Sequence, residues 1–148
     1  MKTKNLIFLF LLVIGTCMYA CTKDDSCNPQ YPGSMSASVS GSSWNATSMS
    51  SYNDSLTISV SGFADDGSSF TIFLPSNTST GNNTLTSYGP IAVIYDDANC
   101  QSYTVSSGSI SLNSISNTSV SGSFSGSAPN DNNCKDVLSL SGSFTAYF

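Results

Sequence analysis

The strongest constraint on the fold is a two-residue alternation of apolar side chains with serine and threonine, which runs through most of the chain after residue 34. Successive side chains of a β-strand point to opposite faces of its sheet, so this alternation is typical of strands with one buried and one wet face. In the last segment, Leu138, Leu140 and Phe144 fall on one face, and Ser139 and Ser141 fall on the other. No segment after residue 34 has an apolar pattern of helical spacing long enough for a helix.

Short turn signals rich in Gly, Asp and Asn separate these runs, for example at Gly81-Asn82-Asn83 and between Asp96 and Asn99. Many short alternating strands with such turns predict one all-β domain over residues 34–148. We expect an antiparallel β-sandwich or a partly closed barrel of about 8–10 short strands. The positions expected to face its core are Met35, Ala37, Val39, Ile58, Val60, Phe70, Ile72, Leu74, Ile91, Val93, Tyr95, Tyr103, Val105, Ile110, Leu112, Val120 and Phe124.

The composition restricts the chemistry that such a domain can support. The chain has 33 Ser, 13 Thr and 13 Asn, its nine acidic residues are all Asp, and its four basic residues are all Lys. Without His it lacks the usual general base at neutral pH and the commonest zinc ligand. Without Arg, and with a net charge of −5, it has no basic surface for a nucleic acid. We therefore expect no cofactor, no catalytic residue and no nucleic-acid partner.

The N-terminal residues have the pattern of an export signal. Lys2 and Lys4 precede an unbroken apolar run of nine residues over 6–14, which is too short to span a bilayer and fits the h-region of a signal peptide. The following Met18-Tyr19-Ala20-Cys21 resembles a bacterial lipobox, in which the Cys becomes the lipidated first residue. Residues 1–20 are then the signal peptide of a lipoprotein, and 21–33 are its lipidated tether. A cleavage before Cys17, or an ordinary signal that leaves Cys21 as a thiol, stays open.

The residues after Cys21 indicate where such a lipoprotein would be displayed. Lys23, Asp24 and Asp25 resemble the surface-export signal of Bacteroidota lipoproteins, which implies an outer-membrane lipid anchor and a polypeptide that faces the cell exterior. A plain solvated tether is the alternative interpretation of so short a charge cluster.

Four short motifs mark the domain. The first is a hairpin over 35–46, in which an alternating strand and a glycine turn are followed by Trp44 and Ala46. The others are Ser-Gly-x-Ile-x-Leu at 107–112, Ser-Gly-x-Phe-x-Gly at 121–126 and Gly-x-Phe at 142–144. With these motifs the domain resembles a flavobacterial-type family of Bacteroidota surface lipoproteins. This resemblance implies a β-sandwich-like fold and a lipid anchor, and it transfers no catalytic residue.

Three cysteines remain once the signal and the lipid are accounted for. An exported domain favours disulfides, and Cys100 and Cys134 both fall within the folded part, in Asn-rich loops. The strands expected over 108–115, 118–127 and 136–147 form a meander, which would bring these two loops to the same end of the domain. We predict a Cys100–Cys134 disulfide and place Cys27 in the tether.

The acidic residues occur mostly in turns, where two functional interpretations compete with turn chemistry. Carboxylates are ligands that Ca²⁺ prefers, so Asp65, Asp66, Asp96 and Asp97 are weak calcium candidates, but no spacing matches an ordered calcium loop. Two carboxylates in a cleft would also suit a small glycosidase-like hydrolase acting outside the cell. Asp and Asn are favoured in turns for backbone reasons alone.

The remaining candidates concern binding and modification. Five tyrosines flanked by Asn and Ser could offer a platform on which a sugar stacks, whereas Trp44 fits the core. Asp54-Ser55-Leu56 resembles the O-glycosylation sequence of exported Bacteroidota proteins, which makes Ser55 a candidate acceptor. We expect a non-enzymatic interaction or ligand-binding module, anchored in the membrane, with a glycan or an envelope protein as its partner. The tyrosines considered for stacking are Tyr52, Tyr88, Tyr95, Tyr103 and Tyr147.

Overall fold

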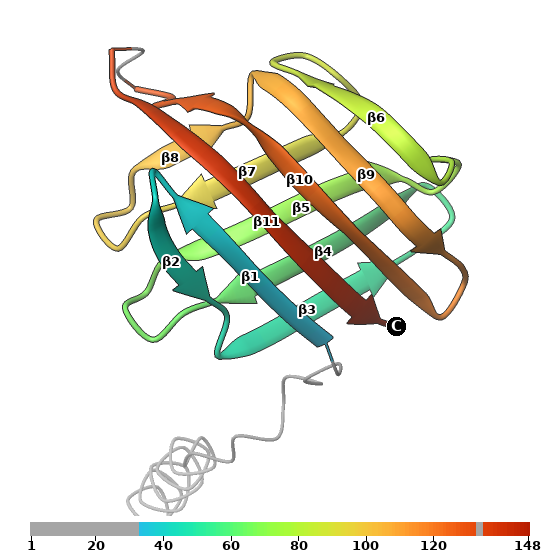
Figure 1. Ribbon diagram of the computed structural model, residues 1–148. Helices are drawn as coiled ribbons and strands as arrows, with labels where there is room; N and C mark the ends of the chain where they lie inside the picture. The colour runs from blue at the N-terminus through green and yellow to red at the C-terminus, as the bar shows by residue number, and fades with distance from the viewer. Residues whose placement is uncertain (1–32, 133–134) are drawn as a thin grey trace, which may run out of the picture.

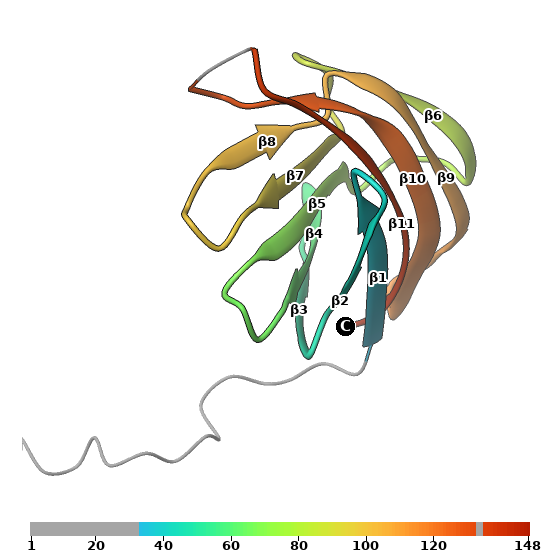
Figure 2. The ribbon, with the colours of Figure 1, turned by 60° about the vertical axis from the view of Figure 1, so that its left-hand side comes forward.

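The computed structural model describes residues 33–132 and 135–148, and it places them in two antiparallel sheets packed face to face (Figures 1 and 2). The six-stranded sheet has the order β2-β1-β11-β10-β9-β6, and the five-stranded sheet has the order β3-β4-β5-β7-β8. The strands are β1 (Gly33–Val39), β2 (Ser42–Asn45), β3 (Ser48–Asn53), β4 (Thr57–Phe63), β5 (Ser69–Pro75), β6 (Gly81–Thr86), β7 (Ala92–Asp96), β8 (Ser102–Thr104), β9 (Ser107–Ile115), β10 (Ser119–Pro129) and β11 (Val137–Tyr147).

The prediction of an antiparallel sandwich is confirmed, and the sheets do not close into a barrel. The described part of the chain has eleven strands where about 8–10 were expected from the sequence. One added strand is β6, which begins at the Gly81-Asn82-Asn83 segment that was predicted to be a turn. Pairing with β9 places Asn82 opposite Ser111, so the tertiary contact overrides the local turn preference. No helix of the described residues is long and apolar enough to pass through a membrane.

The core lies between the two sheets and is centred on an aromatic cluster. The Phe70 ring lies 4.8 Å from Trp44 and from Tyr95, and 5.5 Å from Phe124 on the opposite sheet. The indole N–H of Trp44 donates a hydrogen bond of 2.8 Å to the Oγ of Ser68, which is itself buried. Because this N–H has a partner, Trp44 can enter the core without a desolvation penalty, as its expected core position requires.

Short turns connect the strands and set their register. Ser40 and Gly41 join β1 to β2 with φ values of 49° and 90°, which is the two-residue hairpin geometry that matches the twist of the strands. Asp54 closes the β3–β4 turn, where its Oδ1 accepts hydrogen bonds from the backbone N–H groups of Leu56 and Thr57, both at 2.7 Å. Polar side chains in the turns therefore have a structural role. The sequence alone could not distinguish this role from ligand binding.

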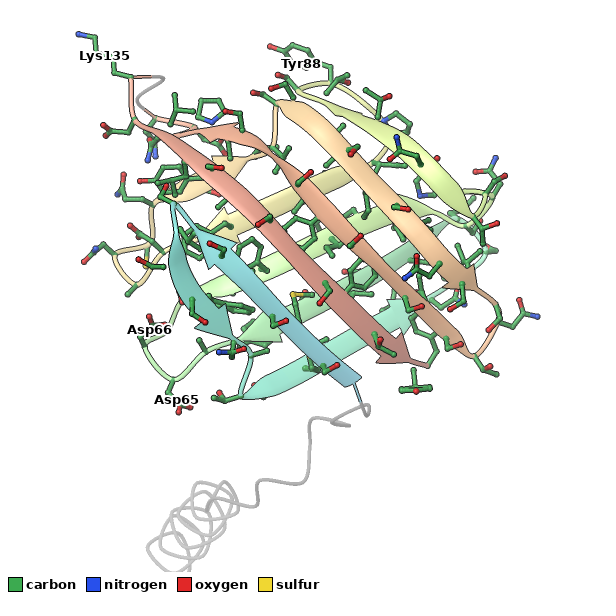
Figure 3. The ribbon with its side chains drawn as sticks, viewed as in Figure 1. Asp65, Asp66, Tyr88 and Lys135 are labelled. Atoms are coloured by element: carbon green, nitrogen blue, oxygen red, sulfur yellow. The ribbon has the colours of Figure 1, made fainter. Side chains whose placement is uncertain are left out.

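The outer face of the six-stranded sheet is covered with small uncharged polar side chains (Figure 3). Two cross-strand rows extend over all six strands and contain only Ser, Thr and Asn, which keeps the face wet without charge. The first row is Asn45, Ser36, Ser143, Ser123, Ser111 and Asn82, and the second is Ser43, Ser38, Ser141, Ser125, Ser109 and Thr84.

Candidate functional site

Two hollows, each of about 330 Å³, open on different sides of the sandwich. We name them the Asp54 hollow and the Tyr88 hollow after one residue in each. The Asp54 hollow is lined by Asn53, Asp54, Ser55, Ile58, Ser76, Thr78, Ile115, Ser116 and Asn117. The Tyr88 hollow is lined by Ser87, Tyr88, Thr104, Ser106, Pro129, Asn130 and Asp131.

The Asp54 hollow lies where the β3–β4 turn meets the β9–β10 turn. The Oδ2 atom of Asp54 accepts a hydrogen bond of 3.0 Å from the Tyr52 hydroxyl, in addition to the two backbone bonds that its Oδ1 accepts. These backbone bonds stabilise the charged carboxylate and lower the pKa of Asp54. The hydrogen bond to Asp54, followed by the negative charge of that residue, raises the pKa of Tyr52. The Asp54 carboxylate is therefore already hydrogen-bonded to the backbone of its own turn.

A second contact closes the Asp54 hollow across the two sheets. The Nδ2 of Asn53 donates a hydrogen bond of 3.4 Å to the backbone oxygen of Asn117. The backbone N–H of Phe148 bonds to the oxygen of Thr118 at 3.0 Å, so this hollow lies beside the C-terminal residue. Ser55 is exposed on its rim, in the turn that Asp54 holds. Its O-glycosylation stays a prediction.

The Tyr88 hollow is formed by three segments that are distant in the sequence. The β6–β7 connection supplies Ser87 and Tyr88, the end of β8 supplies Thr104, and the end of β10 leads into Asp131. Asp131 joins two of these segments, because its carboxylate oxygens accept hydrogen bonds from the backbone N–H of Thr104 at 3.3 Å and from its Oγ1 at 3.1 Å. The fold thereby fixes a carboxylate at the wall of an open, hydroxyl-lined hollow.

Tyr88 is the most exposed large hydrophobic side chain of the described residues, with a relative exposure of 101%. Its ring extends away from the body of the sandwich, on the side opposite the entry of the chain at Gly33 (Figure 3). The suggestion that Tyr95 and Tyr103 also form a surface platform is wrong, since both are 8% exposed and belong to the core. Their positions in the alternating apolar pattern explain this burial, because they point inward with Val93 and Val105.

The acidic pairs lie at two hairpin turns, and one Asp of each pair accepts hydrogen bonds from its own turn. Asp66 accepts hydrogen bonds from the hydroxyl and the backbone N–H of Ser68, which lower its pKa, and Asp97 caps the backbone of the β7–β8 turn. Within residues 33–132 and 135–148, no three His, Cys or Asp side chains form a group that could hold a metal ion. Asp65 and Asp66 lie on the β4–β5 turn (Figure 3), and Asp96 and Asp97 lie at the start of the neighbouring β7–β8 turn.

Neither hollow has the pair of carboxylates that glycoside hydrolysis requires. Asp54 is the single acidic residue that lines one hollow, and Asp131 is the single acidic residue that lines the other.

Cys100 is exposed in the β7–β8 turn and forms no disulfide with another described residue, and Cys134 lies outside the described residues. The neighbours of these two positions are nevertheless in contact. The backbone N–H of Asp131 bonds to the oxygen of Ser102 at 2.9 Å, and the Nδ2 of Asn130 lies 3.5 Å from the Oε1 of Gln101. The predicted disulfide therefore stays a prediction, which the contact between the flanking residues supports. Cys17, Cys21, Lys23, Asp24, Asp25 and Cys27 also lie outside the described residues.

Sequence reasoning did not identify the residues that surround Tyr88. Thr104, Ser106, Pro129 and Asn130 come from turns and strand ends that looked like ordinary connections. The only local signal was Tyr88 itself, which precedes Gly89-Pro90 and falls outside any alternating run. An aromatic residue in such a connection has no strand face on which to be buried, so exposure could have been anticipated.

Fold and site together define an all-β sandwich domain with open hollows between its loops. Residues 32–146 match the family described as Domain of unknown function (DUF6252), and the chain belongs to that family. Neither the curated proteins nor the solved structures include a match to the chain.

Proposed function

We propose that the protein is a lipid-anchored, surface-exposed module of the outer membrane that binds a ligand and carries out no chemistry of its own. The Tyr88 hollow is the observation that carries this proposal. It is open to solvent, it presents a fully exposed aromatic ring beside hydroxyl groups, and it contains one carboxylate. Ligand sites combine an apolar surface with a few fixed polar groups in this way.

The position of the hollow suits display from a membrane. The chain enters the domain at Gly33, and the Tyr88 hollow lies on the opposite side of the sandwich (Figures 1 and 3). Gly33 comes twelve positions after Cys21, so a fully extended tether would reach about 40 Å. A lipid on Cys21 would leave the Tyr88 side facing outward, as expected for a Bacteroidota-type surface lipoprotein.

The anchoring part of the proposal is tested by metabolic labelling with a fatty-acid probe. We expect label on the wild-type chain and on Cys17→Ser, and no label on Cys21→Ser. Label that persists in Cys21→Ser and disappears in Cys17→Ser would place the lipid on the other cysteine. Replacement of Lys23, Asp24 and Asp25 by Ala should reduce the protein that added protease can reach on intact cells. Unchanged accessibility would contradict the export signal.

The binding part is tested by photo-cross-linking on intact cells that carry the full-length chain. A benzophenone side chain in place of Tyr88 should yield covalent adducts, because the ligand would lie against that ring. The same side chain in place of Asn117, at the Asp54 hollow, is the matched control and should yield few. Equal adducts at both positions, or none at Tyr88, would refute binding at this hollow.

A further inference from the structure

We infer that the Tyr88 hollow is a subsite for an uncharged saccharide, in which Tyr88 stacks on a sugar ring and Asp131 accepts hydrogen bonds from its hydroxyl groups. This inference rests on the proposed binding function and names the class of ligand.

The ring of Tyr88 can pack against the apolar face of a sugar. A sugar has a face of C–H groups that packs on an aromatic ring, and a rim of hydroxyl groups that needs polar partners. Tyr88 offers a rigid apolar face with a polar tip, and Pro129 adds a second apolar surface to the same lining. Since the Tyr88 side chain makes no hydrogen bond within the described residues and is fully exposed, no rearrangement is needed before a ligand can stack on it.

Polar side chains of the hollow can accept hydrogen bonds from the hydroxyl groups of a sugar. A carboxylate has about four acceptor sites, and Thr104 occupies two of those on Asp131, so about two remain for hydroxyl groups of a ligand. The Oγ of Ser106 donates to the backbone oxygen of Ser127 at 3.3 Å, which leaves its lone pairs as acceptors. Ser87 adds an exposed hydroxyl beside Tyr88. The hydrogen bonds of Asp131 and Ser106 hold these two side chains in place, so a ligand would not have to order them.

The charge of the hollow restricts the ligand further. No basic side chain lines it, one carboxylate does, and the whole protein carries a net charge of −5. An anionic ligand such as a uronic acid or a phosphate would therefore be repelled. A cation could also contact Tyr88 and Asp131, but its binding would weaken as salt is added. An uncharged polyol can stack on Tyr88 and donate hydrogen bonds to Asp131 and to the Ser106 hydroxyl oxygen.

The size sets the expected affinity. A volume of about 330 Å³ is at the small end of ligand pockets, so the hollow accommodates a short segment of a glycan. One stacked ring and a few hydrogen bonds to exposed groups give weak binding, with a Kd on the order of 0.1–10 mM. Several copies on a cell surface would strengthen this through avidity.

The experiment uses the full-length chain in a detergent without a sugar headgroup. Saturation-transfer NMR is recorded with maltotriose, cellotriose, xylotriose, mannotriose and chitotriose, and with trigalacturonic acid and the deacetylated chitotriose as anionic and cationic counterparts. We expect at least one neutral trisaccharide to bind, with a Kd that changes little between low and high salt. Tyr88→Ala should weaken that binding at least about tenfold, and Asp131→Asn should weaken it by a smaller factor. Tyr147→Ala and Asp65→Asn, which change an exposed Tyr and an exposed Asp elsewhere, should leave the Kd unchanged.

Three results would overturn the inference. The first is that no neutral trisaccharide binds at about 10 mM. The second is that only the cationic trisaccharide binds, with an affinity that falls as salt is added, which would make the ligand a cation. The third is that a neutral trisaccharide binds equally well to Tyr88→Ala. In the first two cases adducts at position 88 on intact cells would still support the proposed binding function, whereas their absence would refute that function as well.

Discussion

The Asp54 hollow and the Tyr88 hollow have the same volume and a similar lining of Ser, Thr and Asn, with one carboxylate in each. They differ in what the carboxylate holds. Asp54 accepts three hydrogen bonds from Tyr52, Leu56 and Thr57, all within three residues of itself. Asp131 accepts its hydrogen bonds from Thr104, 27 residues away along the chain.

This difference separates two uses of the same residue type. A carboxylate that satisfies its own turn is part of the local backbone, and its pKa is lowered by those bonds. A carboxylate that joins two distant segments keeps acceptor sites directed to the space between them. The exposed ring of Tyr88 lies at that second place and has no equivalent in the lining of the Asp54 hollow. The comparison therefore favours the Tyr88 hollow as the binding region.

The largest expected effect concerns the predicted disulfide near the Tyr88 hollow. If Cys100 bonds to Cys134, the bridge closes a loop of 34 residues, and its loss in Cys100→Ser should reduce the free energy of unfolding by roughly 3–4 kcal/mol. Hydrogen exchange should rise in the segments around Ser102 and Asp131 and stay unchanged around Asp54. Chemical denaturation and exchange mass spectrometry measure both quantities. Equal stability of the wild type and Cys100→Ser, with Cys100 alkylated without prior reduction, would show that no bridge exists.

A smaller effect is expected from removing each carboxylate. Asp131→Ala should lower the free energy of unfolding by about 0.5–1.5 kcal/mol, because it deletes hydrogen bonds at the surface. Asp54→Ala should lower it further, because it leaves two backbone N–H groups of the turn and the Tyr52 hydroxyl without their acceptor. Urea denaturation of both variants gives the order. A larger loss in Asp131→Ala than in Asp54→Ala would contradict the assignment of Asp54 to structure and Asp131 to binding.

The smallest effect is expected from acid. Asp54 and Asp66 have pKa values below the ordinary 3.8, so each stabilises the fold above that pH and loses its contribution as the pH falls through its folded-state pKa. The double variant Asp54→Asn, Asp66→Asn keeps an oxygen acceptor in each turn but does not titrate. Its melting temperature should decrease less between pH 6 and pH 3 than that of the wild type. Parallel curves for the two proteins would show that these carboxylates do not govern acid stability.

The sandwich could be predicted from the sequence because the relevant signal is local. Alternation within each strand assigns its buried face, as for Ile58 and Val60 in β4 or Leu140 and Phe144 in β11, and no distant contact is needed for that assignment. β6 was missed because its strand conformation depends on pairing with β9. Its six residues include a single buried apolar side chain, Leu85, and two consecutive asparagines that indicate a turn.

The Tyr88 hollow could not be predicted from the sequence, because its residues are brought together by the fold. No spacing along the chain indicates that they are neighbours. Tyr88 and Asp131 are 43 residues apart, and nothing in either local sequence refers to the other. The sequence could, however, indicate in part which of the five tyrosines are exposed. Tyr95 and Tyr103 continue alternating apolar runs and so had to face the core, whereas Tyr88 lies outside such a run.

The account is tested most directly by the accessibility of the Tyr88 side on living cells. Tyr88→Cys and Asn117→Cys are prepared separately in the full-length chain with Cys27, Cys100 and Cys134 changed to Ser, and both are treated with a membrane-impermeant PEG-maleimide. We predict that position 88 reacts on intact cells to the same extent as after lysis, and faster than position 117, which lies beside the C-terminal residue. Reaction at position 88 only after lysis would contradict display of this hollow on the cell surface.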